Sequence, residues 1–187
     1  HPGLNIAITA PPGWKIQNEA DQLMLVNAAR DAGLRLVPVP PKAGKTHEEI
    51  IRNAIKPDSG RVEARNLNGL NATHFTGTQS NEKGQRQNIE LTVVTGTDGG
   101  NYALMYLAKD AATLQGNRAP MQEAERSFRP LSAADKTAAR PWTLRTAQMP
   151  RGGFAELARS SPLANAEQQL KLINGVYAGG EIKPGTP

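Results

Sequence analysis

Histidine, glutamate and serine are the residues with which this chain could do chemistry, because it has 3 histidines and no cysteine. The pair His47-Glu48 comes nearest to a zinc-protease helix. Such a helix has the pattern His-Glu-x-x-His, in which two imidazoles bind one ion and the glutamate activates a water molecule. Ile51, which supplies no ligand, stands where the second histidine should be. We therefore predict that His47 is a first-turn helix residue and not a metal ligand.

The other residues with catalytic potential lack suitable partners. His74 lies in an expected strand, which favours a solvated or hydrogen-bonded histidine over a catalytic one. No serine stands in the pattern Gly-x-Ser-x-Gly that is typical of hydrolases. Two acidic pairs are expected on helix surfaces without the geometry of a glycosidase, namely Glu48/Glu49 and Glu123/Glu125.

The glycine-rich segments do not predict a phosphate site. No helix is expected after Gly96–Gly100, and Gly44-Lys45-Thr46 lacks the earlier glycine of a P-loop. With no nucleophile, ligand cluster or nucleotide loop, we predict no catalytic residue, no metal site and no cofactor within this chain.

The composition of the chain excludes further kinds of site and partner. The absence of cysteine rules out disulfides and thiolate zinc sites. The net charge of +5 is spread along the chain, with 15 basic and 13 acidic residues up to Pro130, and 7 and 4 beyond it. Aromatic residues, which would stack on bases, make up only 4%. We therefore expect no nucleic-acid partner, and since no apolar run reaches about 18 residues we expect no membrane span.

Residues 1–130 carry the pattern of an antiparallel sheet covered by helices, an α+β fold. The expected strands are 4–9, 14–16, 23–26, 34–39, 61–65, 72–78, 87–95 and 101–108, with a hairpin at 96–100. Pro38 indicates that its strand either is an edge strand or ends near this residue. A helix begins with a capping box formed by Thr46 and Glu49, and its apolar positions are Ile50, Ile51, Ala54 and Ile55. A second helix is expected to start near Pro120.

Residues 131–140 are rich in alanine and polar residues, which predicts a linker or a short connecting helix. Residues 141–187 predict a small module with a strand at 141–148, a helix from Arg151 and a second helix at 165–173. The chain ends where a closing strand should start, which would leave a sheet edge unpaired. It also begins with His1 rather than methionine. From both features we expect a piece of a larger protein.

The N-terminal part resembles a known family. Leu4-Asn5-Ile6-Ala7-Ile8 leads to Pro12-Gly13-Trp14, and the part ends in Phe128-Arg129-Pro130-Leu131. This resembles the PsbP/Mog1-type α/β/α sandwich, in particular the version that follows the catalytic domain of bacterial HtpX- and BepA-like (CAAX-prenyl-protease-like) zinc metallopeptidases. The resemblance implies a periplasmic or envelope location. It also implies a parent protein whose zinc lies in a preceding catalytic domain that this chain lacks.

The C-terminal part is similar to the LysM-like module at the end of the same proteins. Arg151-Gly152-Gly153-Phe154 matches the start of its first helix, and Asn174-Gly175 follows its second. The resemblance implies glycan or partner contacts at six positions: Gly152, Gly153, Phe154, Gly175, Val176 and Tyr177. This sequence departs from the usual Gly-Asp-Thr opening, so the first helix loses its side-chain N-cap.

Three functions follow as hypotheses. The first is a non-catalytic accessory region of an envelope metallopeptidase, which positions substrates or partner proteins or restrains the parent catalytic domain. The second is a module that binds the N-acetylglucosamine glycans of peptidoglycan. The third is a stand-alone partner-binding protein. Trp14 is a candidate exposed anchor for a partner. Because aromatic residues are scarce in this chain, burial in a hydrophobic core is the stronger expectation for both Trp14 and Trp142.

Overall fold

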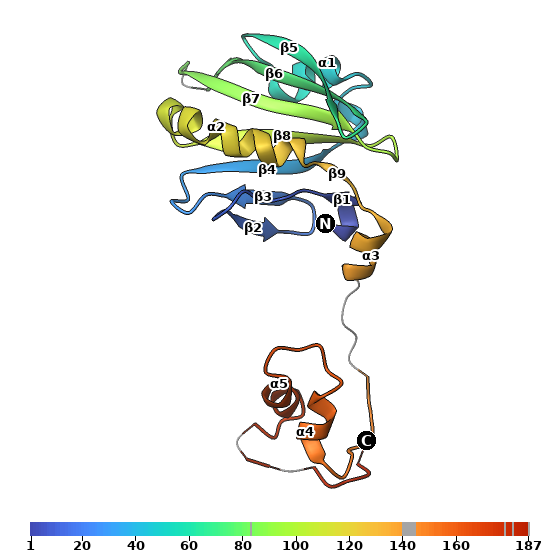
Figure 1. The fold of residues 1–187 in the computed structure, drawn as a ribbon. Coiled ribbons are helices and arrows are strands. Elements are labelled where there is room, and N and C mark those ends of the chain that lie inside the picture. Colours follow the sequence, from blue (N-terminus) through green and yellow to red (C-terminus); the bar gives the residue numbers. More distant parts are fainter. Residues whose placement is uncertain (83, 140–144, 178, 181, 187) are drawn as a thin grey trace. The chain divides into compact units, whose positions relative to one another are not determined.

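The computed structural model describes residues 1–82, 84–139, 145–177, 179–180 and 182–186 (Figure 1). The chain divides into two compact units, His1–Arg140 and Pro141–Pro187. Each unit has its own packing.

The first unit is built on a 7-stranded antiparallel sheet with the order β2-β3-β4-β8-β7-β6-β5. The strands are β2 (Lys15–Asn18), β3 (Leu23–Val26), β4 (Ala32–Val39), β5 (Ser59–Leu67), β6 (Leu70–Ser80), β7 (Arg86–Thr95) and β8 (Asn101–Ala108). The period-2 alternation of the sequence produces these strands, and the hairpin expected at Gly96–Gly100 joins β7 to β8.

Pro38 stands near the end of β4, as the sequence predicted. The neighbouring strand β3 pairs with β4 only as far as Leu36, whereas β8 pairs with it along its whole length. Pro38 therefore has β8 on one side and no β3 partner on the other, a place where its missing N–H costs little. The strand is nevertheless an interior one.

Helices cover both faces of this sheet, which confirms the α+β class (Figure 1). Helix α2 (Ala111–Arg126) packs on β4 and β8, while α1 (His47–Ile50) packs on the other face against β6 and β7 and continues into the π-helical turn η3 (Ile51–Ile55). The capping box of Thr46 and Glu49 is present. Each helix closes one hydrophobic core: the α2 side includes Leu34, Leu104 and Phe128, and the α1 side includes Ile50, Ile51, Phe75, Leu91 and Val93.

The expected start of the second helix near Pro120 is wrong, because α2 begins at Ala111 and Pro120 lies inside it. Asp110 caps the helix, since its side chain accepts a hydrogen bond from the N–H of Thr113. Pro120 removes one intrahelical hydrogen bond. Burial of Leu114 and Met121 against the sheet holds the helix across that position.

Smaller elements complete the first unit. They are η1 (Pro2–Leu4), β1 (Ile6–Ala7), η2 (Pro41–Ala43), β9 (Arg129–Pro130) and α3 (Ala133–Ala138). The strand expected at 4–9 is shorter than predicted, because Asn5 adopts a positive φ of 53° and only β1 pairs, with β9. Helix α3 supplies the short helix expected in residues 131–140, with Ser132 and Asp135 forming its capping box.

The second unit contains α4 (Gly153–Ala158) and α5 (Ala166–Ile173), which pack on each other. Both helices lie where the sequence placed them. Of the expected strand at 141–148, residues 141–144 lie outside the described residues and 145–148 form no strand. Two backbone hydrogen bonds link Met149 to the C-terminal segment: its N–H donates to the Thr186 carbonyl and its carbonyl accepts from the Gly185 N–H.

Candidate functional site

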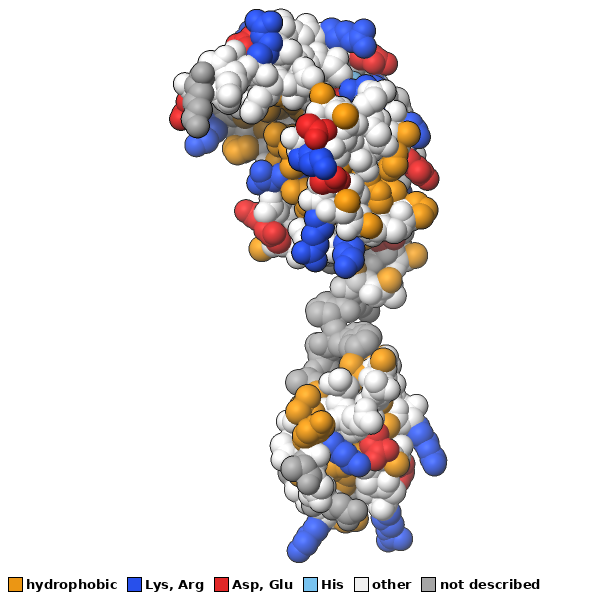
Figure 2. All heavy atoms as spheres, turned by 90° about the vertical axis from the view of Figure 1, so that its left-hand side faces the viewer, with side chains coloured by type: hydrophobic (Ala, Val, Ile, Leu, Met, Phe, Trp, Pro, Cys, Tyr) orange, Lys and Arg blue, Asp and Glu red, His pale blue; other side chains and the backbone are white. Residues whose placement is uncertain are grey.

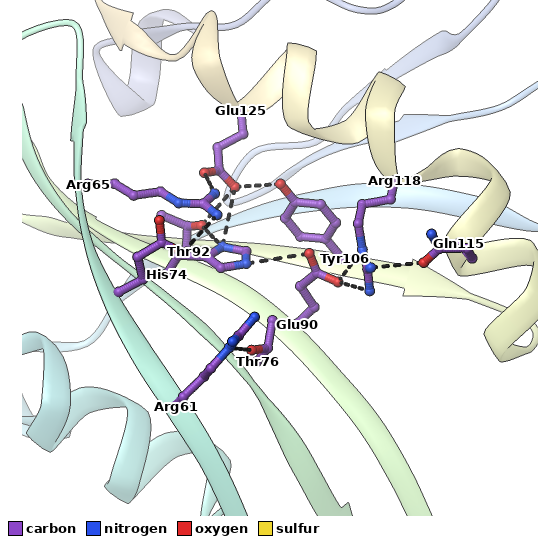
Figure 3. A network of polar contacts seen from close by, with 11 residues as sticks. Arg61, Arg65, His74, Thr76, Glu90, Thr92, Tyr106, Gln115, Arg118 and Glu125 are labelled. Carbon is purple, nitrogen blue, oxygen red and sulfur yellow. Dashed lines mark hydrogen bonds and ion pairs between the residues drawn. The ribbon is translucent and has the colours of Figure 1, made fainter.

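A network of polar side chains lies between α2 and the strands β5 to β8 (Figure 3). Its members are Arg65 from β5, His74 from β6, Glu90 and Thr92 from β7, Tyr106 from β8, and Arg118 and Glu125 from α2. Arg118, Gln122 and Glu125 are spaced four and three residues apart, so they share one face of α2. The apolar residues of α2, which include Leu114, Met121 and Ala124, pack into the hydrophobic core on the same side of the sheet.

Glu125 lies at the centre of the network, with a side chain that is 1% exposed. One carboxylate oxygen accepts a hydrogen bond from Nη1 of Arg65 at 2.8 Å. The other accepts from Oγ1 of Thr92 at 2.7 Å and from the hydroxyl of Tyr106 at 2.6 Å. This carboxylate therefore connects α2 with β5, β7 and β8 at once.

The same carboxylate changes the acid–base properties of its neighbours. Burial and the charge of Glu125 raise the pKa of Tyr106 far above its ordinary value of 10.0, so the hydroxyl stays protonated and donates. Burial alone would lower the pKa of Arg65, but the hydrogen bond and charge of Glu125 outweigh it and raise that pKa. Both partners are thus fixed as donors.

His74 is buried beside this group and connects Glu125 to a second carboxylate. Its Nδ1 lies 2.8 Å from Oγ1 of Thr92, and its Nε2 lies 3.4 Å from the carboxylate of Glu90. The single hydroxyl proton of Thr92 is directed at Glu125, so Nδ1 of His74 must be the donor in its contact with Thr92. The ring also meets Tyr106 edge to face, with centroids 5.9 Å apart.

Glu90 is the second buried carboxylate, with a side chain 3% exposed. One of its oxygens lies 3.0 Å from Nε and 2.8 Å from Nη2 of Arg118. Burial by itself raises the pKa of Glu90, but the contacts with His74 and Arg118 outweigh burial and hold that pKa below its ordinary value. Glu90 therefore fixes a second point of α2 to the sheet.

A hollow of about 250 Å³ borders the network and is rich in arginine. Arg61, Arg65 and Arg118 line it, together with His74 and Glu90. Arg65 and Arg118 are each bound to a buried carboxylate, whereas Arg61 donates only through Nε, to Thr76 at 3.3 Å, among the described residues. Arg61 is therefore the cation of this hollow whose terminal nitrogens are available to a ligand.

The sequence analysis made predictions for two of these residues, and one of them was wrong. His74 is hydrogen-bonded, as expected, but Glu125 is not the surface acid that the sequence indicated. Glu123, two positions earlier, is exposed. The helical spacing of Arg118, Gln122 and Glu125 could have indicated that one polar face of this helix points inward. The sequence does not show, however, that polar residues of β6 and β7 lie beneath that face.

His47 is the first residue of α1, as predicted, and is buried against the other face of the sheet. Its Nδ1 lies 2.9 Å from Oγ1 of Thr73 and its Nε2 lies 2.8 Å from Oγ1 of Thr95. Burial lowers the pKa of His47, because the charged form is poorly solvated there. Among the described residues, no group of three or more His, Asp or Glu side chains is arranged to hold a metal ion.

These arrangements hold elements of the first unit together. Within the described residues, no buried polar atom of a side chain is left without a hydrogen-bond partner. The acidic and basic side chains of the network lie between α2 and the sheet, and they supply one another's hydrogen-bond partners. The network therefore fixes α2 on the sheet at two points, Glu90 and Glu125.

In the second unit, a hollow of about 590 Å³ collects most of the contact residues implied by the LysM resemblance. The lining includes Gly152, Gly153, Phe154, Val176 and Tyr177. The sixth residue, Gly175, does not line it; it follows α5 with a positive φ of 70°. The fold thus places the segment before α4 beside the segment after α5.

The residues around this hollow differ in exposure. Phe154, in the first turn of α4, is buried, whereas Tyr177 is 71% exposed. Helix α4 has no side-chain N-cap, and the N–H of Gly152 instead donates to the Glu156 carboxylate at 2.9 Å. Tyr177 therefore offers an accessible aromatic ring at the rim of a glycine-lined hollow.

Trp14 is half-buried and packs against the core on the α2 side of the sheet. Trp142 lies outside the described residues.

Charged side chains of both signs are interspersed over the face shown in Figure 2, with apolar side chains between them. No helix among the described residues has the length and apolar character needed to cross a membrane.

Comparisons with known proteins give fold likeness only. No protein-family model and no curated protein matches this sequence. The solution structure of a cyanobacterial PsbP (CyanoP) from Synechocystis sp. is similar at 12% identity and a TM-score of 0.44, over 68% of this chain and 87% of that one. The crystal structure of LpqN, involved in cell envelope biogenesis of Mycobacterium tuberculosis, is similar at 14% identity and a TM-score of 0.41, over 66% and 82%. Neither likeness is close enough to assign a function.

Proposed function

We propose that this chain is a non-catalytic accessory region of a larger protein, which binds and positions a partner or substrate protein. The observation that carries the proposal is the closed network under α2. His74, Glu90 and Glu125, which are buried acid–base groups, hold the helix on the sheet through contacts with one another and with arginines. A unit that uses its acids and bases in this way supplies a rigid scaffold for binding.

The parent that fits the sequence resemblance is an envelope zinc metallopeptidase. Its zinc and its catalytic helix would belong to a preceding domain, because Ile51 stands where a second zinc-binding histidine would be needed after His47. In that setting the region would act in the periplasm or at the envelope, on substrates or partners of the peptidase.

Incubation of the purified chain with labelled casein, with and without Zn²⁺, tests the non-catalytic role. We expect no hydrolysis under either condition. Hydrolysis that disappears in the variant His74→Gln but persists in an exposed-site variant away from the network, Gln17→Ala, would place a catalytic group in the network and contradict the proposal. The His74→Gln variant must also show the same melting transition as the wild-type chain, so that a loss of hydrolysis cannot be due to unfolding.

A second candidate function is glycan binding by the second unit. It is favoured by the hollow that joins the Gly152–Phe154 segment to Tyr177, because an exposed aromatic ring beside accessible backbone is suited to a sugar ring. Sedimentation with purified peptidoglycan at about 0.5 M salt, where exposed charge attraction is screened, tests it. We expect retention to be lost in Tyr177→Ala and kept in Ile173→Ala, a control that is also exposed in this unit (50%).

A further inference from the structure

Strand β5 lies at one border of the 7-stranded sheet and pairs only with β6 among the described residues (Figure 1). It is long for an edge strand, with 9 residues from Ser59 to Leu67. Alternate residues of an edge strand direct their N–H and C=O groups away from the sheet, where another strand can pair with them. The opposite border is formed by β2, which has only 4 residues.

The side chains of β5 alternate between two different hollows. Arg61, Glu63 and Arg65 line the arginine-rich hollow on the α2 face. Val62, between them, lines a second hollow on the α1 face. A chain added beside β5 would continue the same alternation, with one set of side chains beside each hollow.

The hollow on the α1 face is open, and its wall combines apolar residues with the charged residues Glu48, Arg52 and Lys56. Its volume is about 530 Å³, and its lining includes Ile51, Pro57, Val62 and Phe75. Val62 is 48% exposed, while Phe75, its cross-strand partner, is buried. Apolar side chains of an added strand would cover Val62 here.

Glycine keeps the edge accessible beside this hollow. Gly60 pairs with Gly77, and the ring of Phe75 lies against both, since a Cβ at either position would come within 2.4 Å of it. Gly60 itself therefore adds no side chain beside the outer edge of β5. A glycine in a strand is often found where another backbone approaches closely.

The hollow on the α2 face favours negative charge. Of its arginines, Arg61 keeps its terminal nitrogens without a partner within the described part of the chain. Glu63, the acidic residue on this face of β5, already contacts Arg65 at 3.5 Å. A carboxylate on the added strand would therefore meet Arg61 and not an unpaired acid.

We infer that β5 is a docking edge for an extended peptide segment of a partner protein in which apolar and acidic residues alternate. The apolar residues cover Val62 on the α1 face, the acidic residues meet Arg61 on the α2 face, and main-chain hydrogen bonds join the segment to β5. This inference rests on the proposed accessory function and names the kind of partner segment that the first unit binds.

Fluorescence anisotropy with the full chain tests the inference. The probe is a labelled peptide of about ten residues, with valine or leucine at odd positions and glutamate at even positions, matched to the length of β5. Its control has the same composition, with the apolar and acidic residues separated into two blocks. We expect the alternating peptide to bind at least about tenfold more tightly than the block peptide.

Variants of exposed residues locate the site. We expect Val62→Lys and Arg61→Glu each to weaken binding on the order of tenfold, because each places an unfavourable charge against the bound strand. The matched controls are Ile16→Lys on the opposite edge strand, where the exposure is a similar 52%, and Arg86→Glu, an exposed strand arginine. Neither control should change the affinity.

Amide NMR of the ¹⁵N-labelled wild-type chain gives a readout that depends on no variant. We expect the alternating peptide to shift the signals of Ser59–Leu67 and to slow the exchange of alternate β5 amides. Shifts confined to β2 or to the second unit, or equal binding of the block peptide, would overturn the inference. So would pairing of β5 with a second copy of the chain that the peptide cannot displace. Because casein hydrolysis is measured separately, such a result would leave the non-catalytic function standing.

Discussion

Glu125→Gln is the substitution that most directly tests how α2 is held on the sheet. Its carboxylate accepts from Arg65, Thr92 and Tyr106, which are all donors. Glutamine has nearly the same shape but offers one acceptor oxygen and one donor nitrogen. Whichever way the amide is turned, its N–H₂ faces at least one of these donors, so at least one hydrogen bond is lost and two donors are brought together.

The structure sets the magnitude of the effect. With the amide oxygen toward Thr92 and Tyr106, the variant loses the hydrogen bond to Arg65, and a hydrogen bond to a charged group contributes about 1.5–3 kcal/mol. Arg65, whose side chain is 24% exposed, then keeps only the longer contact with Glu63 at 3.5 Å. Breaking a buried ion pair costs about 3–5 kcal/mol. Since Arg65 retains some solvent, we expect a loss of about 2–4 kcal/mol in the free energy of unfolding.

Urea unfolding followed through amide NMR signals of the sheet measures this loss without interference from the second unit. Glu123→Gln is the matched control, because Glu123 is exposed on the same helix, and it should change the free energy by less than about 0.5 kcal/mol. A loss below about 1 kcal/mol for Glu125→Gln, or one equal to that of the control, would refute the view that this carboxylate holds α2 in place.

Three further predictions concern stability. Gly77→Ala should lower the free energy of unfolding by about 1–3 kcal/mol in urea titrations, because its Cβ would lie 2.2 Å from the carbonyl oxygen of Ser59; an unchanged midpoint would contradict this packing. The pKa of Glu90 is lowered in the folded state, so its contribution is present above its ordinary value of 4.5 and lost as the pH falls below it; the acid side of the stability profile should flatten in Glu90→Gln. The pKa of His47 is also lowered, so the unfolded chain takes up its proton first and stability should fall as the pH drops below 6.5; a profile of His47→Gln as steep as that of the parent chain would refute this.

Local patterns were sufficient for much of the fold. Strand β8 has the boundaries expected from alternation, the Gly96–Gly100 hairpin joins its expected strands, and the capping box at Thr46 opens α1. These features depend on neighbours a few residues apart, whose geometry the sequence contains directly. The start of α2 could not be placed from Pro120, because tertiary burial of Leu114 outweighs the loss of a single helical hydrogen bond.

The sequence by itself determined the α+β class and the place of His47 in the first turn of a helix, and for His74 it left a solvated and a hydrogen-bonded state open. Only the tertiary structure decided that Glu125 and Glu90 are buried and paired with arginines, and that β5 pairs on one side only among the described residues and lies between two hollows. The reason is physical: a strand's pattern shows which residues share a face, but whether that face meets solvent, a helix or a neighbouring strand depends on elements distant in the sequence.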